Sequence, residues 1–206
     1  MPRKTKDEAE KTRTRILSRA LALFARQGYE HTTFTDIAAA LKMTKGAIYW
    51  HFASKEALLI ALVDEMLDKF KQQIDALKPQ GELTFPEVAD MMVKDAVATI
   101  RDAHGSAFFM FMESRIRWTD ASMAKVRENL LANDKFSPLH AFRTALQNDV
   151  RAGRVRPDVS VENMANACVS LWHGLVRARI ENFLSSDLEA TLREAYEAIW
   201  NSLKRV

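Results

Sequence analysis

Apolar residues recur at intervals of three and four along most of this chain, which is the spacing of one face of an α-helix. Residues 10–27 follow this pattern and predict an amphipathic helix that ends at Gly28, a residue type common just past a helix end. Ser54 is expected to cap a longer helix, in which the apolar spacing continues for more than five turns and stops at Lys78-Pro79-Gln80-Gly81.

Two short helices are predicted between these longer ones. Thr33 can cap the first of them, with Asp36 placed near the positive end of the helix dipole. A brief break at Lys42-Met43 follows. Thr44 can then cap the second short helix, which is expected to run to about residue 51.

The rest of the chain is also predicted to be helical, with no strand-like alternation. The approximate ranges are 85–103, 106–118, 120–133, 137–152, 160–184 and 187–204. Breaks are expected at residues 102–105 and 153–158, and Ser137-Pro138 marks either the start of a helix or a kink in a longer one. The fold is therefore predicted to be all-α. The six Gly and five Pro among 206 residues agree, because strands joined by tight turns need more of both.

Two short helices joined by a tight turn and preceded by a supporting helix form a helix-turn-helix, whose second helix enters the major groove of DNA. Small residues near the start of that helix allow close approach to DNA, and Gly46 and Ala47 meet this need. Ile48 and Phe52 lie four residues apart and are the expected inward pair that fixes the helix on the core.

The outward groups of this motif are expected to contact DNA. Free backbone N–H groups around Thr44 and Lys45 can hold a phosphate, and Tyr49 and His51 are the best side-chain candidates for phosphate contacts. For Tyr49 the alternative is packing in the small core, and Trp50 either stacks on a sugar or covers the core. The predicted DNA-contacting set is Thr33, Lys42, Thr44, Lys45, Gly46, Ala47, Tyr49, Trp50, His51 and Lys55.

The charge distribution favours a polyanionic partner. The net charge is +3, but residues 1–55 carry 11 Lys and Arg against five Asp and Glu, whereas residues 56–206 carry 19 against 22. Such a basic block suits nucleic acid or an anionic membrane surface, and a solvated charged face is the alternative. At the basic N-terminus, Arg3, Lys4 and Lys6 either lie in the minor groove or belong to a disordered tail.

Residues 10–70 resemble the DNA-binding domain of the tetracycline-repressor (TetR/AcrR) family of bacterial regulators. The resemblance rests on the spacing of Gly28-Tyr29, Asp36-Ile37-Ala38, residues 44–52 and Lys55-Glu56-Ala57-Leu58. The string Ile-Tyr-Trp-His-Phe within residues 48–52 is especially similar to the multidrug-efflux branch of the family.

This resemblance implies an all-α homodimer. Its three-helix DNA-binding domain would span residues 10–70, with the helix-turn-helix at 33–52, and a ligand-binding and dimerisation domain of about six helices would span 71–206. The family commonly has Gly in a left-handed conformation in the turn. Here that residue is Lys42, at a cost of roughly 1–2 kcal/mol. The last two helices, 160–184 and 187–204, are expected to pack against a second subunit, and burial in the monomer core is the alternative.

The second domain is rich in Met and aromatic residues, which suit an adaptable apolar ligand pocket, although ordinary helix core is the alternative. Residues 108–112 are all apolar, so their helix is buried all round or faces a cavity. A buried, charged Glu113 would favour a cationic ligand. The predicted pocket residues are Met66, Phe70, Met91, Met92, Phe108, Phe109, Met112, Glu113, His140, Trp172 and His173.

Other functional classes find little support in the sequence. The five His and the single Cys168 have no metal-site spacing, and no catalytic or cofactor-binding motif occurs, so we expect neither an enzyme nor a metal or cofactor. One cysteine, no secretory signal and no long apolar run favour the bacterial cytoplasm. The prediction is a ligand-released repressor of a palindromic operator, with a multidrug-efflux operon as a candidate target. The alternatives are a regulator of a metabolic operon and a non-specific, architectural DNA-binding protein.

Overall fold

The computed structural model describes residues 6–77, 82–132 and 137–205. Secondary structure in these residues is helical except for one isolated antiparallel bridge between Val155 and Lys204, and the all-α prediction is confirmed. No helix in the described segments is long and apolar enough to cross a membrane. The described helices fall into two compact units, one within residues 1–65 and 103–131 and the other within residues 66–102 and 132–206.

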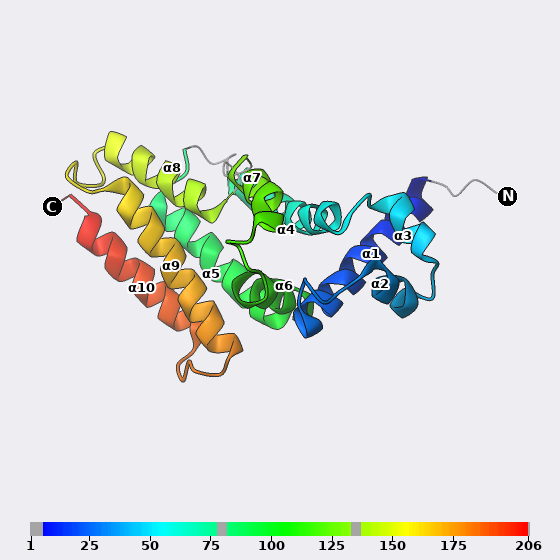
Figure 1. The fold of residues 1–206 in the computed structure, drawn as a ribbon. Helices are drawn as coiled ribbons and strands as arrows, with labels where there is room; N and C mark the ends of the chain where they lie inside the picture. Colours follow the sequence, from blue (N-terminus) through cyan, green and yellow to red (C-terminus); the bar gives the residue numbers. More distant parts are fainter. Residues whose placement is uncertain (1–5, 78–81, 133–136, 206) are drawn as a thin grey trace. The chain divides into compact units, whose positions relative to one another are not determined.

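The first unit contains the helices predicted to bind DNA, in which α2 packs against α1 and α3 packs against α2 (Figure 1). Its members are α1 (Lys6–Gln27), α2 (Phe34–Leu41), α3 (Lys45–His51), the first part of α4 (Lys55–Leu77), α6 (Ala103–Ser114), a 3₁₀ turn (Ala121–Met123) and α7 (Ala124–Ala132) up to residue 131. The apolar stripe predicted for the first helix is buried, including Ile16, Leu17 and Phe24. Helix α6 packs on α1, where the rings of Phe24 and Phe111 stack with centroids 5.3 Å apart.

The second unit is a bundle of long helices that lie side by side in Figure 1. Its members are the second part of α4, α5 (Phe85–Arg101), α8 (Pro138–Arg151), α9 (Val161–Ile180) and α10 (Leu188–Leu203). A buried carboxylate joins the start of α5 to the end of α8. Asp149 accepts hydrogen bonds from the backbone N–H of Phe85 at 2.7 Å and from Nε of Arg154 at 2.6 Å.

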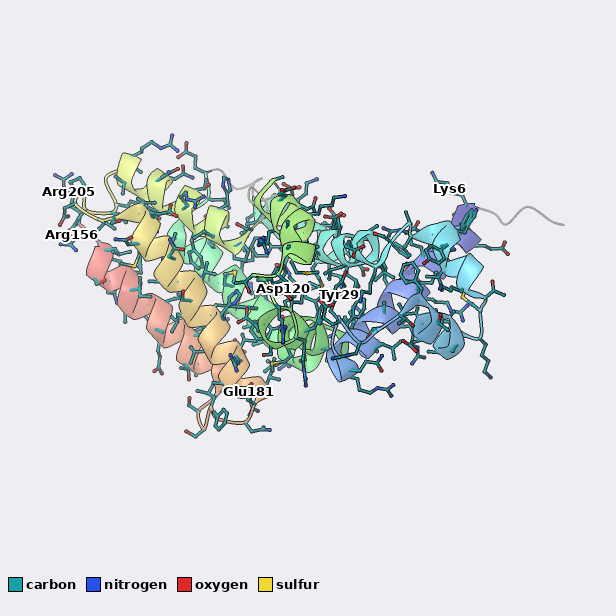
Figure 2. All side chains as sticks on the ribbon, in the orientation of Figure 1. Lys6, Tyr29, Asp120, Arg156, Glu181 and Arg205 are labelled. Carbon is teal, nitrogen blue, oxygen red and sulfur yellow. The ribbon has the colours of Figure 1, made fainter. Side chains whose placement is uncertain are left out.

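Backbone hydrogen bonds also join the end of α10 to the segment after α8. The N–H of Arg156 donates to the carbonyl of Leu203, and the N–H of Arg205 donates to the carbonyl of Arg154. Figure 2 labels Arg156 and Arg205, which lie near one another at this end of the bundle. The segment between α8 and α9 is therefore fixed to the C-terminal helix rather than left as a free loop.

Several predicted helix boundaries are confirmed and others are corrected. Ser137 caps α8 by accepting a hydrogen bond from the N–H of His140, so Ser137-Pro138 starts a helix. The predicted break at 102–105 is confirmed at Asp102 but is shorter than expected, because α6 already begins at Ala103. Helix α6 also ends at Ser114 rather than at 118, and α9 ends at Ile180 rather than at 184. The predicted helix end at residues 78–81 lies outside the described residues.

The reason for the early end of α9 is a left-handed residue. Asn182 has a φ of 60°, a conformation that the chain adopts just after many helix ends. The N–H groups of Phe183 and Leu184 both donate to the carbonyl of Ala178, which closes the last turn. Phe183, which falls inside the predicted helix range 160–184, therefore lies in the loop and is 81% exposed.

Candidate nucleic-acid interface

Reciprocal hydrogen bonds fix the start of α2. The hydroxyl of Thr33 accepts from the N–H of Asp36, while the Asp36 carboxylate accepts from the N–H of Thr33 at 2.8 Å and from its hydroxyl at 2.7 Å. This capping box satisfies N–H groups that the first turn of a helix leaves free. The hydrogen bonds from the side chain and then the backbone of Thr33 lower the pKa of Asp36. The predicted cap at Thr33 is thus confirmed.

The turn between α2 and α3 has a left-handed residue at the position where the family commonly has Gly. Lys42 has φ 55° and ψ 42°, as expected, and its N–H donates to the carbonyl of Ala39. The N–H of Met43 donates to the carbonyl of Ala38, which completes a closed helix end. The side chain of Lys42 is exposed, so the turn places a positive charge at the surface.

Helix α3 has one anchored side and one exposed side. Ile48 is fully buried and Phe52 is 4% exposed, which confirms the predicted inward pair. Thr44 caps the helix by accepting from the N–H of Ala47 at 3.2 Å. On the other side, Trp50 is 70% exposed and Tyr49 is 50% exposed.

The exposed side of α3 combines aromatic rings with positive charge. The ring of Tyr49 packs edge-on against Phe34, with centroids 4.9 Å apart, and Nζ of Lys45 lies 5.8 Å from the centre of the Tyr49 ring. The half-buried His51 ring lies 4.5 Å from that of Trp50. The Tyr49 ring therefore packs on Phe34 while half of its surface stays exposed, and its phosphate contact stays a prediction.

Space at the start of α3 comes from a glycine. A Cβ atom added to Gly46 would meet a single neighbour within 4 Å, the hydroxyl oxygen of Thr44 at 3.9 Å. Gly46 is exposed and Ala47 is half-buried, so the first turn presents little side-chain bulk. A DNA backbone or base edge can therefore approach the N-terminal turn of α3 closely.

Lys55 has a structural role that the sequence did not reveal. Its ammonium group donates to the carbonyl of Tyr29 at 2.9 Å and to that of Thr32 at 3.2 Å, with the carbonyl of Glu30 at 3.4 Å. The same Nζ atom lies 4.2 Å from the centre of the Tyr29 ring, a cation–π contact. The first residue of α4 therefore holds the loop that leads into α2.

Tyr29, labelled in Figure 2, is the other half of this contact. Its side chain is 2% exposed, and its ring lies 5.3 Å from that of Phe24 on α1. Burial, followed by the charges of Glu56 and Glu30, raises the pKa of the Tyr29 phenol, so the hydroxyl stays neutral. Lys55 thus rests on an uncharged ring and on carbonyl oxygens rather than on a carboxylate.

The residues predicted to line a ligand pocket divide between the two compact units. Phe108, Phe109, Met112 and Glu113 lie on α6 in the first unit. The other seven lie in the second unit, where the indole N–H of Trp172 donates to the carbonyl of Met92 at 2.9 Å. Glu113 is exposed, so the buried charge that would favour a cationic ligand is not found. The pocket itself stays a prediction.

Within the described residues there is no cluster of His, Cys, Asp and Glu suited to a metal ion.

Two short, capped helices follow a supporting helix, and the second short helix has one anchored side and one exposed side. This arrangement defines a helix-turn-helix regulator of transcription. The family profile described as "Bacterial regulatory proteins, tetR family" matches residues 16–62. The chain is 46% identical over 205 residues to the HTH-type transcriptional regulator SrpR of Pseudomonas putida, an alignment that covers 99% of this chain and 91% of that protein. The protein therefore belongs to the tetR family and is a transcriptional regulator, not an enzyme.

Solved structures share the fold over nearly the whole chain. NalD, described as the secondary repressor of the MexAB-OprM multidrug efflux pump in Pseudomonas aeruginosa, superposes with a TM-score of 0.77 at 20% identity, covering 97% of this chain and 99% of that one. The complex of SmeT with triclosan gives a TM-score of 0.78 at 23% identity, with 94% and 92% covered. At these identities the similarity establishes the fold alone.

Removing the Lys55 ammonium tests its role in holding the loop. Lys55→Met keeps the aliphatic stem but leaves carbonyl oxygens without their charged donor, so the free energy of unfolding should fall by about 1–3 kcal/mol. The matched control is Lys45→Met, whose exposed ammonium lies over the Tyr49 ring, with an expected change within about 0.5 kcal/mol. Urea denaturation followed by circular dichroism measures both. Equal stability of the two variants would contradict this role.

Proposed function

We propose that the protein is a homodimeric repressor that acts in the bacterial cytoplasm and binds a palindromic operator through α3 of each subunit. A small apolar or amphipathic effector would release it. The exposed side of α3 carries this proposal, because large aromatic side chains lie there beside a positive charge on a helix whose opposite side is anchored. The basic balance of residues 1–55 supports a polyanionic partner at this end of the chain.

The proposed contacts follow from where each group lies. Lys45 and Thr44, at the start of α3, would reach a base edge or a phosphate, with Gly46 and Ala47 leaving room for the approach. Tyr49 and His51 would contact phosphates, and Trp50 would stack on a sugar. Thr33 at the start of α2 and Lys42 in the turn would flank them. Lys6, together with Arg3 and Lys4, which lie outside the described residues, would reach into the minor groove. Lys55 would act mainly by holding the loop before α2.

Neutralising Lys45 should weaken binding to double-stranded DNA recovered by selection from a random pool. If Lys45 contacts a phosphate, Lys45→Met lowers affinity for selected and random DNA alike, and the slope of log K against log salt becomes shallower by about 0.9. If it contacts a base, affinity for the selected DNA falls more than affinity for random DNA. Fluorescence anisotropy titrations at several salt concentrations distinguish these results.

The control for this variant is Lys69→Met, which changes an exposed lysine on the part of α4 that belongs to the second unit. It should bind both DNAs as the wild type does. If Lys45→Met had the same DNA affinity and salt slope as the wild type, the proposal that Lys45 contacts DNA would be wrong. A wild-type ratio of selected to random affinity near one would favour an architectural DNA-binding protein instead.

The dimer proposal rests on the surface of α9. Ala167, Ser170 and Gly174 are exposed and spaced by three and four, and Leu171 and Leu175 beside them are half-buried. A Cβ atom added to Gly174 would meet nothing within 4 Å in the single chain. Small residues along one side of a helix allow another helix to approach closely, so this side of α9 suits a symmetric contact with its counterpart in a second subunit, together with α10.

A bulky charge on this side of α9 should separate the subunits without unfolding them. Gly174→Glu places a carboxylate where a single chain has open space, and Glu favours a helix more than Gly does. The variant should therefore sediment as a folded monomer and lose most of its operator affinity. Gln147→Glu, on an exposed position of α8, should stay dimeric. A Gly174→Glu variant that sediments as a dimer would contradict this interface.

The effector proposal rests on the place of α6. The predicted pocket residues Phe108, Phe109 and Met112 lie on the same helix as Phe111, whose ring stacks on Phe24 of α1. A shift of α6 on ligand binding would therefore act directly on α1, against which α2 packs. The fold shared with NalD, an efflux-pump repressor, and with SmeT, which binds triclosan, supports an efflux operon and an apolar effector.

Triclosan is a suitable probe for this coupling. It should bind the wild-type protein and lower its affinity for the selected DNA by about 5- to 150-fold, the usual range of allosteric coupling. Phe111→Leu removes the ring stack on Phe24 and should reduce that factor while calorimetry still shows triclosan binding. Phe142→Leu, a buried aromatic residue of the second unit, is the control and should keep the full factor. If triclosan lowered the DNA affinity of all three proteins by the same factor, coupling through α6 would be contradicted.

A further inference from the structure

A basic groove lies between α1 and α2, which pack side by side in the first unit (Figure 1). It has a volume of about 700 Å³. Its polar lining consists of Arg15, Arg19, Thr14 and Ser18 from α1, together with Lys42 from the turn after α2, and the rest of the lining is small or apolar. We refer to it as the α1–α2 groove. It lies outside α3, which carries the proposed base and phosphate contacts.

The cations of this groove are not balanced by the protein. Among the described residues, no carboxylate forms an ion pair with Arg15, Arg19 or Lys42, whereas the neighbouring Arg13 on α1 pairs with Glu10. All three side chains are exposed. Arg15 and Arg19 are four residues apart on one side of α1, a spacing at which like charges repel and slightly destabilise a helix. The pattern therefore costs stability in the free protein and suits an anion that comes from outside.

We propose that the α1–α2 groove binds phosphate groups of the DNA backbone next to the segment read by α3. This inference rests on the proposed operator binding. The groove ends at Lys42, two residues before the Thr44 cap of α3, so DNA seated on the start of α3 lies close to one end of the groove. Two guanidinium groups offer paired N–H donors that match the geometry of a phosphate, and the Ser18 hydroxyl adds a further donor.

A DNA backbone is a better match for this groove than an acidic protein segment. Residues 40–42 of the groove lead in sequence directly into the recognition helix, and the excess positive charge of the chain lies in the same first 55 residues. Contacts of this kind position the protein without reading sequence. They should therefore strengthen binding to the operator and to unrelated DNA by the same factor.

The test is the double variant Arg15→Gln/Arg19→Gln, which removes both charges and keeps good helix-forming residues. Loss of two phosphate contacts should make the slope of log K against log salt shallower by about 1.8, with equal fold-losses on selected and random DNA. Ethylation interference should lose its signal at phosphates flanking the α3 contacts. Arg26→Gln, an exposed cation of α1 outside the groove, is the control and should match the wild type. Lys42→Gln should give a shallower slope by itself.

The outcomes separate this inference from the proposed function. If Lys45→Met weakens DNA binding but the Arg15/Arg19 variant, folded by circular dichroism, keeps the wild-type affinity and slope, the groove proposal is overturned and operator binding stands. If neither change affects DNA binding, operator binding through this unit fails as well. If the groove variant binds DNA normally but no longer represses transcription in a purified system, an acidic protein partner replaces DNA as the occupant.

Discussion

The DNA-reading helices of this protein are too short to be stable alone, since α2 has eight residues and α3 has seven. Contacts with other parts of the chain must therefore stabilise them. Lys55 provides one long-range contact of this kind, because its ammonium group binds loop carbonyls 23 to 26 residues earlier in the chain. The capping box stabilises the start of α2, which packs on α1, and the buried Ile48 anchors α3, which packs on α2. The exposed side of α3 can present aromatic and charged groups to DNA only while these contacts persist.

The same compact unit contains α6, which in the proposed mechanism would connect DNA reading to the ligand response. The stack of Phe111 on Phe24 joins a helix rich in predicted pocket residues to the helix that supports the motif. A regulator of this kind needs two states of similar free energy, and a ligand favours one of them by its differential affinity. An aromatic stack between α6 and α1 is a local contact that such a ligand can strengthen or weaken without unfolding either helix.

Local sequence patterns were enough to predict much of the fold and of the DNA-reading motif. Thr33 with Asp36, and Ile48 with Phe52, act over three or four residues, and spacing alone identifies such pairs. The role of Lys55 was missed because its hydrogen-bond partners are backbone carbonyls, which carry no residue-type signal, and the Tyr29 ring that it also contacts lies 26 residues earlier in the sequence. Helix ends were also misplaced. Asn182 takes a left-handed conformation that its residue type permits but does not require, and Asp102 ends one helix directly before the next begins.

The central claim is that a pair of α3 helices reads one specific, two-fold symmetric DNA site. Selection from a random pool of double-stranded DNA with the full-length protein tests this most directly. The account predicts enrichment of a single inverted repeat whose half-sites are centred one helical turn apart, about 34–36 Å, or a multiple of it. Enrichment of an asymmetric site, or no enrichment despite tight binding, would contradict it.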